Sequence, residues 1–291
     1  MTHAHKHDVN PKTIAYLTIA FGINMLLTLV ELTAGIIGGS IALIGDALHN
    51  TSDAFSILVA IIAYKIGTRK ATSRFSWGFK RAETIGSFVN LILLFISGLY
   101  LLYEGVFKII RPEEIDGGLI IGVSVLALII DAATAKLSHH DAGHNTNMKM
   151  LFLHNLADAL GSVGVIVSGL CVLLLGWNFV DGVIAVMIAG YMIVQAVLSF
   201  SGIVAVLMDA APTDIDLEAV KQSLLKIQGV EDVHHIHMWH IDEHEVGFDC
   251  HVVGCDLNLV PAVQRVLKDE FDIDHSTIQL ERKETCSRCC L

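Results

Sequence analysis

Leu48-His49-Asn50-Thr51-Ser52-Asp53-Ala54 has a close copy later in the chain, Leu153-His154-Asn155-Leu156-Ala157-Asp158-Ala159. Both copies read L-H-N-x-x-D-A, and both lie within long apolar stretches. On a helix, residues four positions apart share a face, so each copy presents an imidazole and a carboxylate together. Two such helices facing each other would supply ligands from His49, Asp53, His154 and Asp158. Two nitrogens and two oxygens suit a tetrahedral site for zinc or a similar divalent ion.

A simpler interpretation is that each polar pair only ties two helices together by hydrogen bonds. Ionisable residues are costly to bury in a membrane and usually mark an ion pathway, which favours the metal site. Asp46 lies three residues before His49, on nearly the same face, and we expect it to act as a relay or as a carboxylate behind the ligands. Glu31, Asp131 and Asn24 are isolated in the sequence; we expect interhelical hydrogen bonds or the lining of a wet cavity.

The composition indicates a membrane protein. Of 291 residues, 53% are hydrophobic and only 17% are charged, and the mean hydropathy is +0.61. The formal charge of −11 argues against a nucleic-acid partner, because phosphate binding needs a basic face. Six apolar stretches each meet the length of about 20 residues that crosses a bilayer. They run over 12–36, 40–66, 83–110, 117–137, 150–176 and 179–208.

Basic residues orient these predicted spans. Lys and Arg gather in the connection between the second and third spans and recur between the fourth and fifth, whereas the opposite connections hold almost none beyond Arg111. By the positive-inside rule, both termini face the cytoplasm. We therefore expect an N-terminal arm over 1–11, a six-helix transmembrane domain over 12–209 and a cytoplasmic domain over 210–291.

The last part of the chain has the pattern of a small α+β domain. It is acidic, with seven Lys and Arg against sixteen Asp and Glu from Ala210 onward. Apolar spacing predicts helix, strand, strand, helix and strand over Ile215–Ile227, Val230–His240, Glu245–Val253, Val260–Lys268 and His275–Glu281. Thr213 and Asp214 are candidate caps of the first helix. Helices on one face of a small sheet follow from this order. Alternation in the second strand directs Val246, Phe248, Cys250 and Val252 to the core and leaves Asp249 and His251 outward.

This domain is rich in possible metal ligands. Its first strand holds His234, His235, His237 and His240, its second His251 and its third Glu281. In a reducing cytosol, the Cys286-x-x-Cys289 pair is better read as metal ligands than as a disulfide. The alternation of His3, His5 and His7 suits a metal-capturing arm, a disordered start or part of an expression tag equally.

Several motifs together resemble the cation diffusion facilitator family, in particular its zinc-transporter branch. They are Gly45 to Asp53, Trp77-Gly78-Phe79-Lys80-Arg81-Ala82-Glu83, Leu153 to Asp158, Val233 to Trp239, and Thr277-Ile278-Gln279. The resemblance covers nearly the whole chain. It implies six transmembrane helices, a ferredoxin-like cytoplasmic domain, a homodimer, and export of zinc in exchange for protons.

The same resemblance implies roles for individual residues. The positions of His49, Asp53, His154 and Asp158 match the transport site. Arg81 and Asp209 match a charge interlock near the dimer interface, and His234, His251 and Glu281 match cytoplasmic zinc ligands. Cys286 and Cys289 match a pair that meets an N-terminal arm of the other protomer. That arm would hold His3 and His5 here and lacks the cysteine found in vesicular zinc transporters.

The sequence therefore predicts a Zn²⁺/proton antiporter working by alternating access, in a plasma, inner or vesicle membrane. Cobalt, cadmium, manganese or iron remains open as the main substrate, and a membrane metal sensor is a second class. The two histidines favour zinc or cobalt over manganese, which prefers oxygen ligands. We expect no enzyme activity, because neither motif carries the extra general base of an H-E-x-x-H helix.

Overall fold

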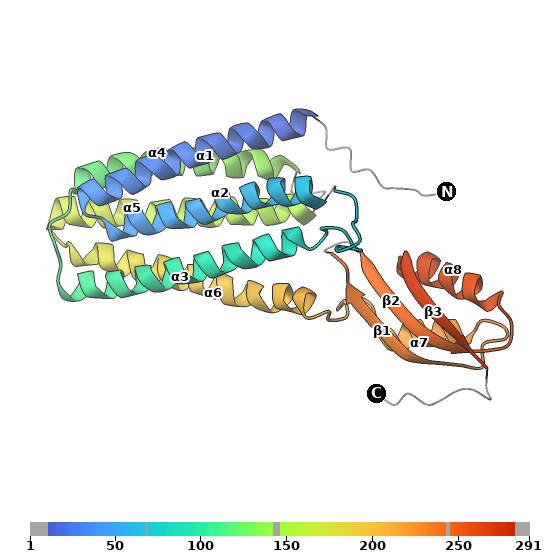
Figure 1. The fold of residues 1–291 in the computed structure, drawn as a ribbon. Coiled ribbons are helices and arrows are strands. Elements are labelled where there is room, and N and C mark those ends of the chain that lie inside the picture. Colours follow the sequence, from blue (N-terminus) through green and yellow to red (C-terminus); the bar gives the residue numbers. More distant parts are fainter. Residues whose placement is uncertain (1–10, 68, 142–145, 243–244, 283–291) are drawn as a thin grey trace. The chain divides into compact units, whose positions relative to one another are not determined.

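A computed structural model of the chain describes residues 11–67, 69–141, 146–242 and 245–282. The side chains of residues 11–21, 23–24, 57, 60, 64, 134–141 and 146–155 lie outside this description. The chain divides into two compact units, one of residues 1–58 with 89–198 and the other of residues 59–88 with 199–291. The helices and strands of both units are drawn in Figure 1.

Six long helices occupy the six apolar stretches. They are α1 (Pro11–Gly38), α2 (Ile41–Gly67), α3 (Ala82–Ile110), α4 (Gly117–Asp141), α5 (Thr146–Leu175) and α6 (Phe179–Leu207). The predicted ranges agree with these helices to within a few residues at each end. Within the described part of the chain, three helical segments are long and apolar enough to cross a membrane: Ala82–Ile110, Leu156–Leu175 and Phe179–Leu207.

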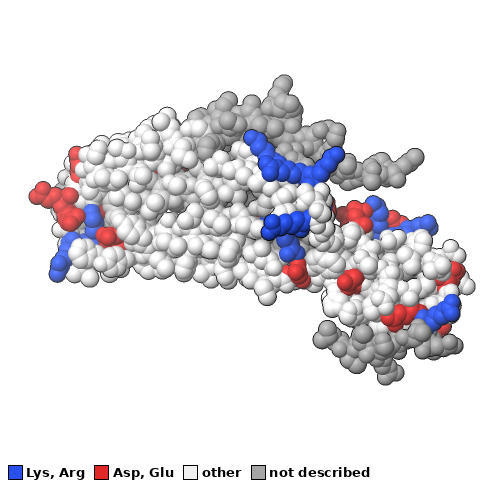
Figure 2. All heavy atoms as spheres, viewed as in Figure 1, with Lys and Arg blue, Asp and Glu red and all other residues white. Residues whose placement is uncertain are grey.

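The outer surface of the helices is apolar. Ile37, Leu174 and Leu198 are 74%, 74% and 73% exposed. In the face drawn in Figure 2, the flank of the helices is nearly free of charged side chains, which gather toward the helix ends. In water, so large an exposed apolar surface would be unfavourable, whereas in a membrane it contacts lipid. This is the surface of an integral membrane protein.

Side chains fix the N-terminus of α2. The backbone turns at Gly39 (φ +69°), a conformation that glycine adopts without strain. Ser40 Oγ then accepts from the amide of Leu43 at 3.0 Å. Asp181 of α6, which is fully buried, accepts from the amides of Ile41 and Ala42 at 2.7 and 3.3 Å. The first amides of a helix have no partner within it, and a carboxylate also suits its positive end. This end of α2 is therefore held against α6.

The C-terminal α/β module contains α7 (Leu217–Leu225), β1 (Asp232–His240), β2 (Val246–Val253), α8 (Leu259–Phe271) and β3 (His275–Glu281). The predicted order of elements is confirmed. The cap of α7 was predicted wrongly: Asp216 accepts from the amide of Glu218 at 3.0 Å, and the helix begins after it.

The strands form one sheet in the order β1-β2-β3, with β1 antiparallel and β3 parallel to β2. Phe248, Cys250 and Val252 of β2 lie in the core, as the alternation predicted, against residues of α7 and α8 such as Leu224 and Leu267. The register places His234 opposite His251 and Val253 opposite Glu281.

Candidate metal centres

Three candidate ligands meet within the helical unit. His49 Nε2 lies 3.1 Å from Asp158 Oδ1 and 3.6 Å from Asp53 Oδ2, and the three ligand atoms lie within 4.8 Å of one another. His49 and Asp53 come from one face of α2, one turn apart, and Asp158 comes from α5. His49 is buried, whereas the Asp53 side chain is 30% exposed. The structure thus brings together three of the four residues that the repeated motif predicted.

The fourth predicted ligand, His154, lies on α5 four residues before Asp158, and its side chain is outside the described part of the structure. Tyr191 of α6, which the sequence analysis did not single out, approaches His49 edge to face, with ring centroids 5.5 Å apart. A lone tyrosine in an apolar span carries no spacing signal, so only the packing of α6 against α2 could reveal it.

Asp46 of α2 contacts α5. Its carboxylate lies 3.3 Å from Ser162 Oγ. The same hydroxyl lies 3.0 Å from Asp131 of α4, and Glu31 of α1 accepts from Asn50 of α2 at 3.0 Å. Glu31 and Asp131, isolated in the sequence, therefore have the interhelical hydrogen bonds expected of them. The side chain of Asn24 lies outside the description.

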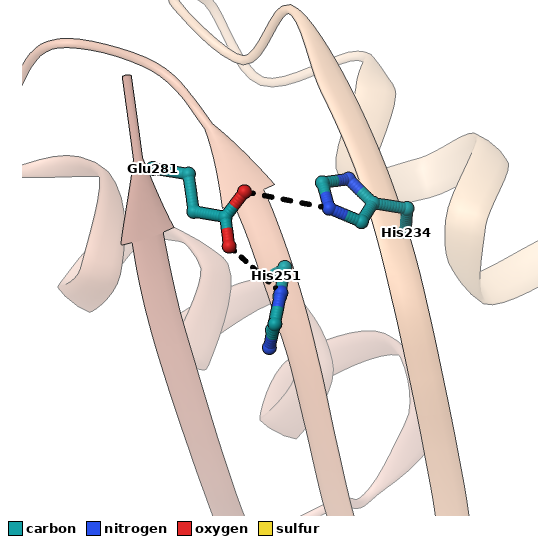
Figure 3. A group of neighbouring side chains, drawn as sticks. All are labelled: His234, His251 and Glu281. Carbon is teal, nitrogen blue, oxygen red and sulfur yellow. Dashed lines mark ion pairs between the residues drawn. The ribbon is translucent and has the colours of Figure 1, made fainter. Parts of the chain in front are cut away.

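A second group lies on the sheet of the α/β module, where each strand supplies one residue (Figure 3). His251 Nδ1 lies 2.9 Å from Glu281 Oε1, and His234 Nε2 lies 3.5 Å from Glu281 Oε2. Their ligand atoms also lie within 4.8 Å of one another. Two imidazoles and a carboxylate are a donor set that zinc accepts, so these side chains fit a bound zinc ion.

A β-bulge widens this histidine cluster. The ladder of β1 is irregular between His234 and His237, and His235 has a φ of +50°. The rings of His234 and His235 lie 5.4 and 4.6 Å from the ring of His251, although strand neighbours normally face opposite sides. Alternation alone therefore could not place His235.

The polar connection before α3 contacts the α/β module within one compact unit. Arg81 forms an ion pair with Asp209 and also donates to the backbone oxygen of His240 at 3.2 Å, and Lys80 pairs with Glu245. Arg81 and Asp209 also line a cavity of about 740 Å³. The predicted ion pair between Arg81 and Asp209 is thus formed.

Among the described residues, neither group includes a cysteine. Cys250 is buried, and burial with help from Asp249 raises the pKa of its thiol to about 12, so it stays protonated at neutral pH. The predicted ligands Cys286, Cys289, His3 and His5 lie outside the described residues.

The fold is that of a helical membrane protein with an additional α/β module. The helices and the module each hold a group of residues that suits a divalent metal ion. The chain matches the cation efflux transmembrane domain over residues 17–208 and the cytoplasmic domain of cation efflux proteins over residues 212–283. It therefore belongs to the cation efflux family, whose members are divalent metal cation transporters and not enzymes.

Named relatives align along nearly the whole chain. The metal cation efflux system protein CzcD of Cupriavidus metallidurans is 30% identical, over 97% of this chain and 90% of its own. The zinc transporter ZitB of Escherichia coli is 30% identical over 97% and 93%. A cadmium, cobalt and zinc/H(+)-K(+) antiporter of Bacillus subtilis is 27% identical over 97% and 92%. The solved metal-bound C-terminal domain of the Cupriavidus CzcD transporter is 33% identical, with a TM-score of 0.22, covering 23% of this chain and 99% of that domain.

Proposed function

We propose that this protein exports Zn²⁺ from the cytoplasm, out of the cell or into a compartment, in exchange for protons. The observation that carries the proposal is the meeting of His49, Asp53 and Asp158 across α2 and α5, with ligand atoms within 4.8 Å. His154, one turn before Asp158 on the same helix, completes the transport site. Nitrogen with carboxylate oxygen suits Zn²⁺ better than oxygen-preferring Mn²⁺.

Exchange with protons follows from the chemistry of these ligands. An imidazole and a carboxylate bind metal only when deprotonated, so zinc and protons compete for the same atoms. Histidine titrates near neutral pH, which lets a modest pH difference drive release. The site loads zinc while open to the cytoplasm and protons while open to the other side.

The proposed topology has six transmembrane helices over 12–209, a short arm over 1–11 and a ferredoxin-like cytoplasmic domain over 210–291, with both termini in the cytoplasm. The apolar flank of the helices and the basic connection before α3 support it. The domain pairs with a second copy, and the Arg81–Asp209 ion pair serves as the charge interlock near that interface. His234, His251 and Glu281 hold a resident zinc ion.

Cobalt and cadmium are the alternative substrates with a specific observation in their favour, because the name of the Bacillus subtilis relative includes both metals. A membrane metal sensor remains the second functional class, and the group of His234, His251 and Glu281 on the module supports it. Metal binding to the module with no metal flux through the helices would favour that class.

The test is zinc uptake into proteoliposomes with an imposed pH gradient. We expect uptake by the wild type to follow the gradient, and Asp53→Ala and Asp158→Ala to abolish it while the protein remains folded, because each variant removes a ligand. Glu114→Gln removes a carboxylate exposed between α3 and α4 and is the matched control, with uptake unchanged.

Undiminished zinc uptake in Asp53→Ala and Asp158→Ala would move the transport pathway elsewhere. Parallel uptake of cobalt and cadmium ranks the substrates. Absence of flux with every ion in the wild type would favour the sensor.

A further inference from the structure

Three buried carboxyl groups lie in the helical unit beside the candidate transport site. Glu31 of α1, Asp46 of α2 and Asp131 of α4 are 0%, 3% and 9% exposed. Asp46 and Asp131 both contact Ser162 Oγ, at 3.3 and 3.0 Å, and Glu31, which lies within electrostatic reach of both carboxyl groups, accepts from Asn50 of α2 at 3.0 Å. The three groups are therefore close enough to form one electrostatic unit, which we call the carboxyl cluster.

Hydrogen positions in the cluster are constrained by Ser162. Its buried hydroxyl lies 3.3 Å from Asp46 Oδ2 and 3.0 Å from Asp131 Oδ2. A serine hydroxyl has one hydrogen to donate, but it can accept through its lone pairs. If each contact is a full two-centre hydrogen bond, one carboxyl group is protonated and donates to the serine oxygen. The geometry thus suits one bound proton between α2 and α4.

Unpartnered buried oxygen atoms are a second observation beside the contacts of Ser162. Glu31 Oε1 is fully buried and has no hydrogen-bond partner among the described residues. The same holds for the hydroxyl of Thr28, one turn before Glu31 on α1. Buried polar atoms are normally paired with protein or water, so such atoms point to water or protons that complete the bonding.

The carboxyl cluster touches both helices that carry the candidate metal ligands, through Asp46 on α2 and through the contacts of Asp46 and Asp131 with Ser162 on α5. Asp46 precedes His49 by three residues on α2, and Ser162 follows Asp158 by four residues on α5. A divalent cation bound at His49 therefore acts on the cluster across about one helical turn. In a medium of low dielectric constant, charges at that separation interact strongly.

We propose that Glu31, Asp46 and Asp131 form a proton-binding site, distinct from the metal ligands, that carries a proton of the exchange. The inference rests on the proposed zinc/proton function. With the metal site empty, the cluster holds a proton that offsets its negative charge. When Zn²⁺ binds to His49, Asp53 and Asp158, its positive charge expels this proton to water on the loading side. When zinc leaves on the other side, a proton from water replaces it.

Two assays on the full chain in proteoliposomes separate metal movement from proton coupling. Zinc accumulation is measured under a gradient of about one pH unit, with a trapped pH dye following proton release. Exchange of labelled for unlabelled zinc is measured at equal pH, where no net proton movement is needed. The variants are Asp131→Asn and Glu31→Gln, with Glu114→Gln as the exposed control that makes the same chemical change.

We expect the two cluster variants to retain zinc exchange. Their accumulation ratio should fall about tenfold for each coupled proton lost, since one pH unit is a factor of ten in proton activity. Asp131→Glu keeps a titratable carboxyl group and should restore part of the coupling. Glu31→Gln gives an independent reading if Asp131→Asn does not elute as a folded species in size exclusion.

Other outcomes overturn the inference. Wild-type coupling in both folded variants excludes the cluster as the proton site, and loss of zinc exchange together with accumulation assigns it to the metal pathway. Coupling that requires K⁺ and is lost in the same variants makes the occupant a K⁺ ion. A wild type whose zinc accumulation ignores the pH gradient contradicts zinc/proton exchange itself, which is a different failure.

Discussion

The imidazole of His49 lies beside two carboxylates, 3.1 Å from Asp158 and 3.6 Å from Asp53, and it can neutralise at most one of them. This excess of negative charge in a buried position favours the arrival of a cation. The second group has the opposite balance, because one carboxylate, that of Glu281, serves two imidazoles.

His251→Ala tests the second group. The experiment uses full-length protein that carries Asp53→Ala, which weakens the membrane site. In this background, His251→Ala should lower the zinc affinity about tenfold or more, because losing even a residue that only hydrogen-bonds to a metal ligand typically lowers metal affinity about tenfold. Isothermal titration calorimetry gives the affinity. His275→Ala, an exposed histidine at the start of β3, is the control and should leave the affinity unchanged. Equal affinities in the two variants would remove His251 from the ligand set.

Cys250 and Cys255 should differ in reactivity. Burial raises the pKa of Cys250 to about 12, and the thiolate is the nucleophile, so iodoacetamide at pH 8 should leave it unlabelled. Cys255 is exposed and should be labelled. Because the folded-state pKa is raised, the thiolate of Cys250 should form only as pH rises toward 12 or on unfolding. Peptide mass spectrometry reads both sites, and rapid labelling of Cys250 in folded protein at pH 8 would contradict its core position.

At the scale of elements, the buried cap of α2 should matter more than an exposed cap. Asp181→Ala leaves the amides of Ile41 and Ala42 without their acceptor, which should cost about 1–3 kcal/mol each. Asp116→Ala removes an exposed cap of α4, which accepts from the amide of Leu119 at 3.1 Å, and should cost about 1 kcal/mol. Thermal unfolding in detergent compares the two, and an equal loss would show that Asp181 is not a special anchor.

The sequence predicted the elements and the meeting of His49, Asp53 and Asp158, but not the other polar contacts between helices. Apolar length defined the six helices, and alternation defined the core face of β2, because both are local properties of the chain. Asp181 hydrogen-bonds to the N-terminus of α2, and Ser162 contacts two aspartates. Both sets of contacts join residues that are far apart in sequence. A lone carboxylate in an apolar span was the one available signal for Asp181. The bulge at His235 depends on a single backbone dihedral angle, which no residue pattern predicts.

At the scale of the whole molecule, Arg81 and Asp209 connect the start of α3 with the end of α6. The pair is partly exposed, so breaking it should change stability by only about 0–1 kcal/mol. We expect Arg81→Asp or Asp209→Arg alone to lower zinc flux, and the exchanged pair to recover part of it. Recovery is partial because Arg81 also binds the carbonyl of His240. A double variant as poor as the worse single variant would argue against a functional ion pair.

Each strand of the module supplies one candidate metal ligand, and this arrangement affects the lifetime of the protein. His234, His251 and Glu281 are far apart along the chain and come together only when all three strands pair in register. An unfolded module would hold zinc weakly, so zinc bound at this proposed site would stabilise the folded form by mass action. Starved of metal, the module would open more often and be degraded sooner. The abundance of the transporter would then follow the zinc content of the cytoplasm, without any change in its synthesis.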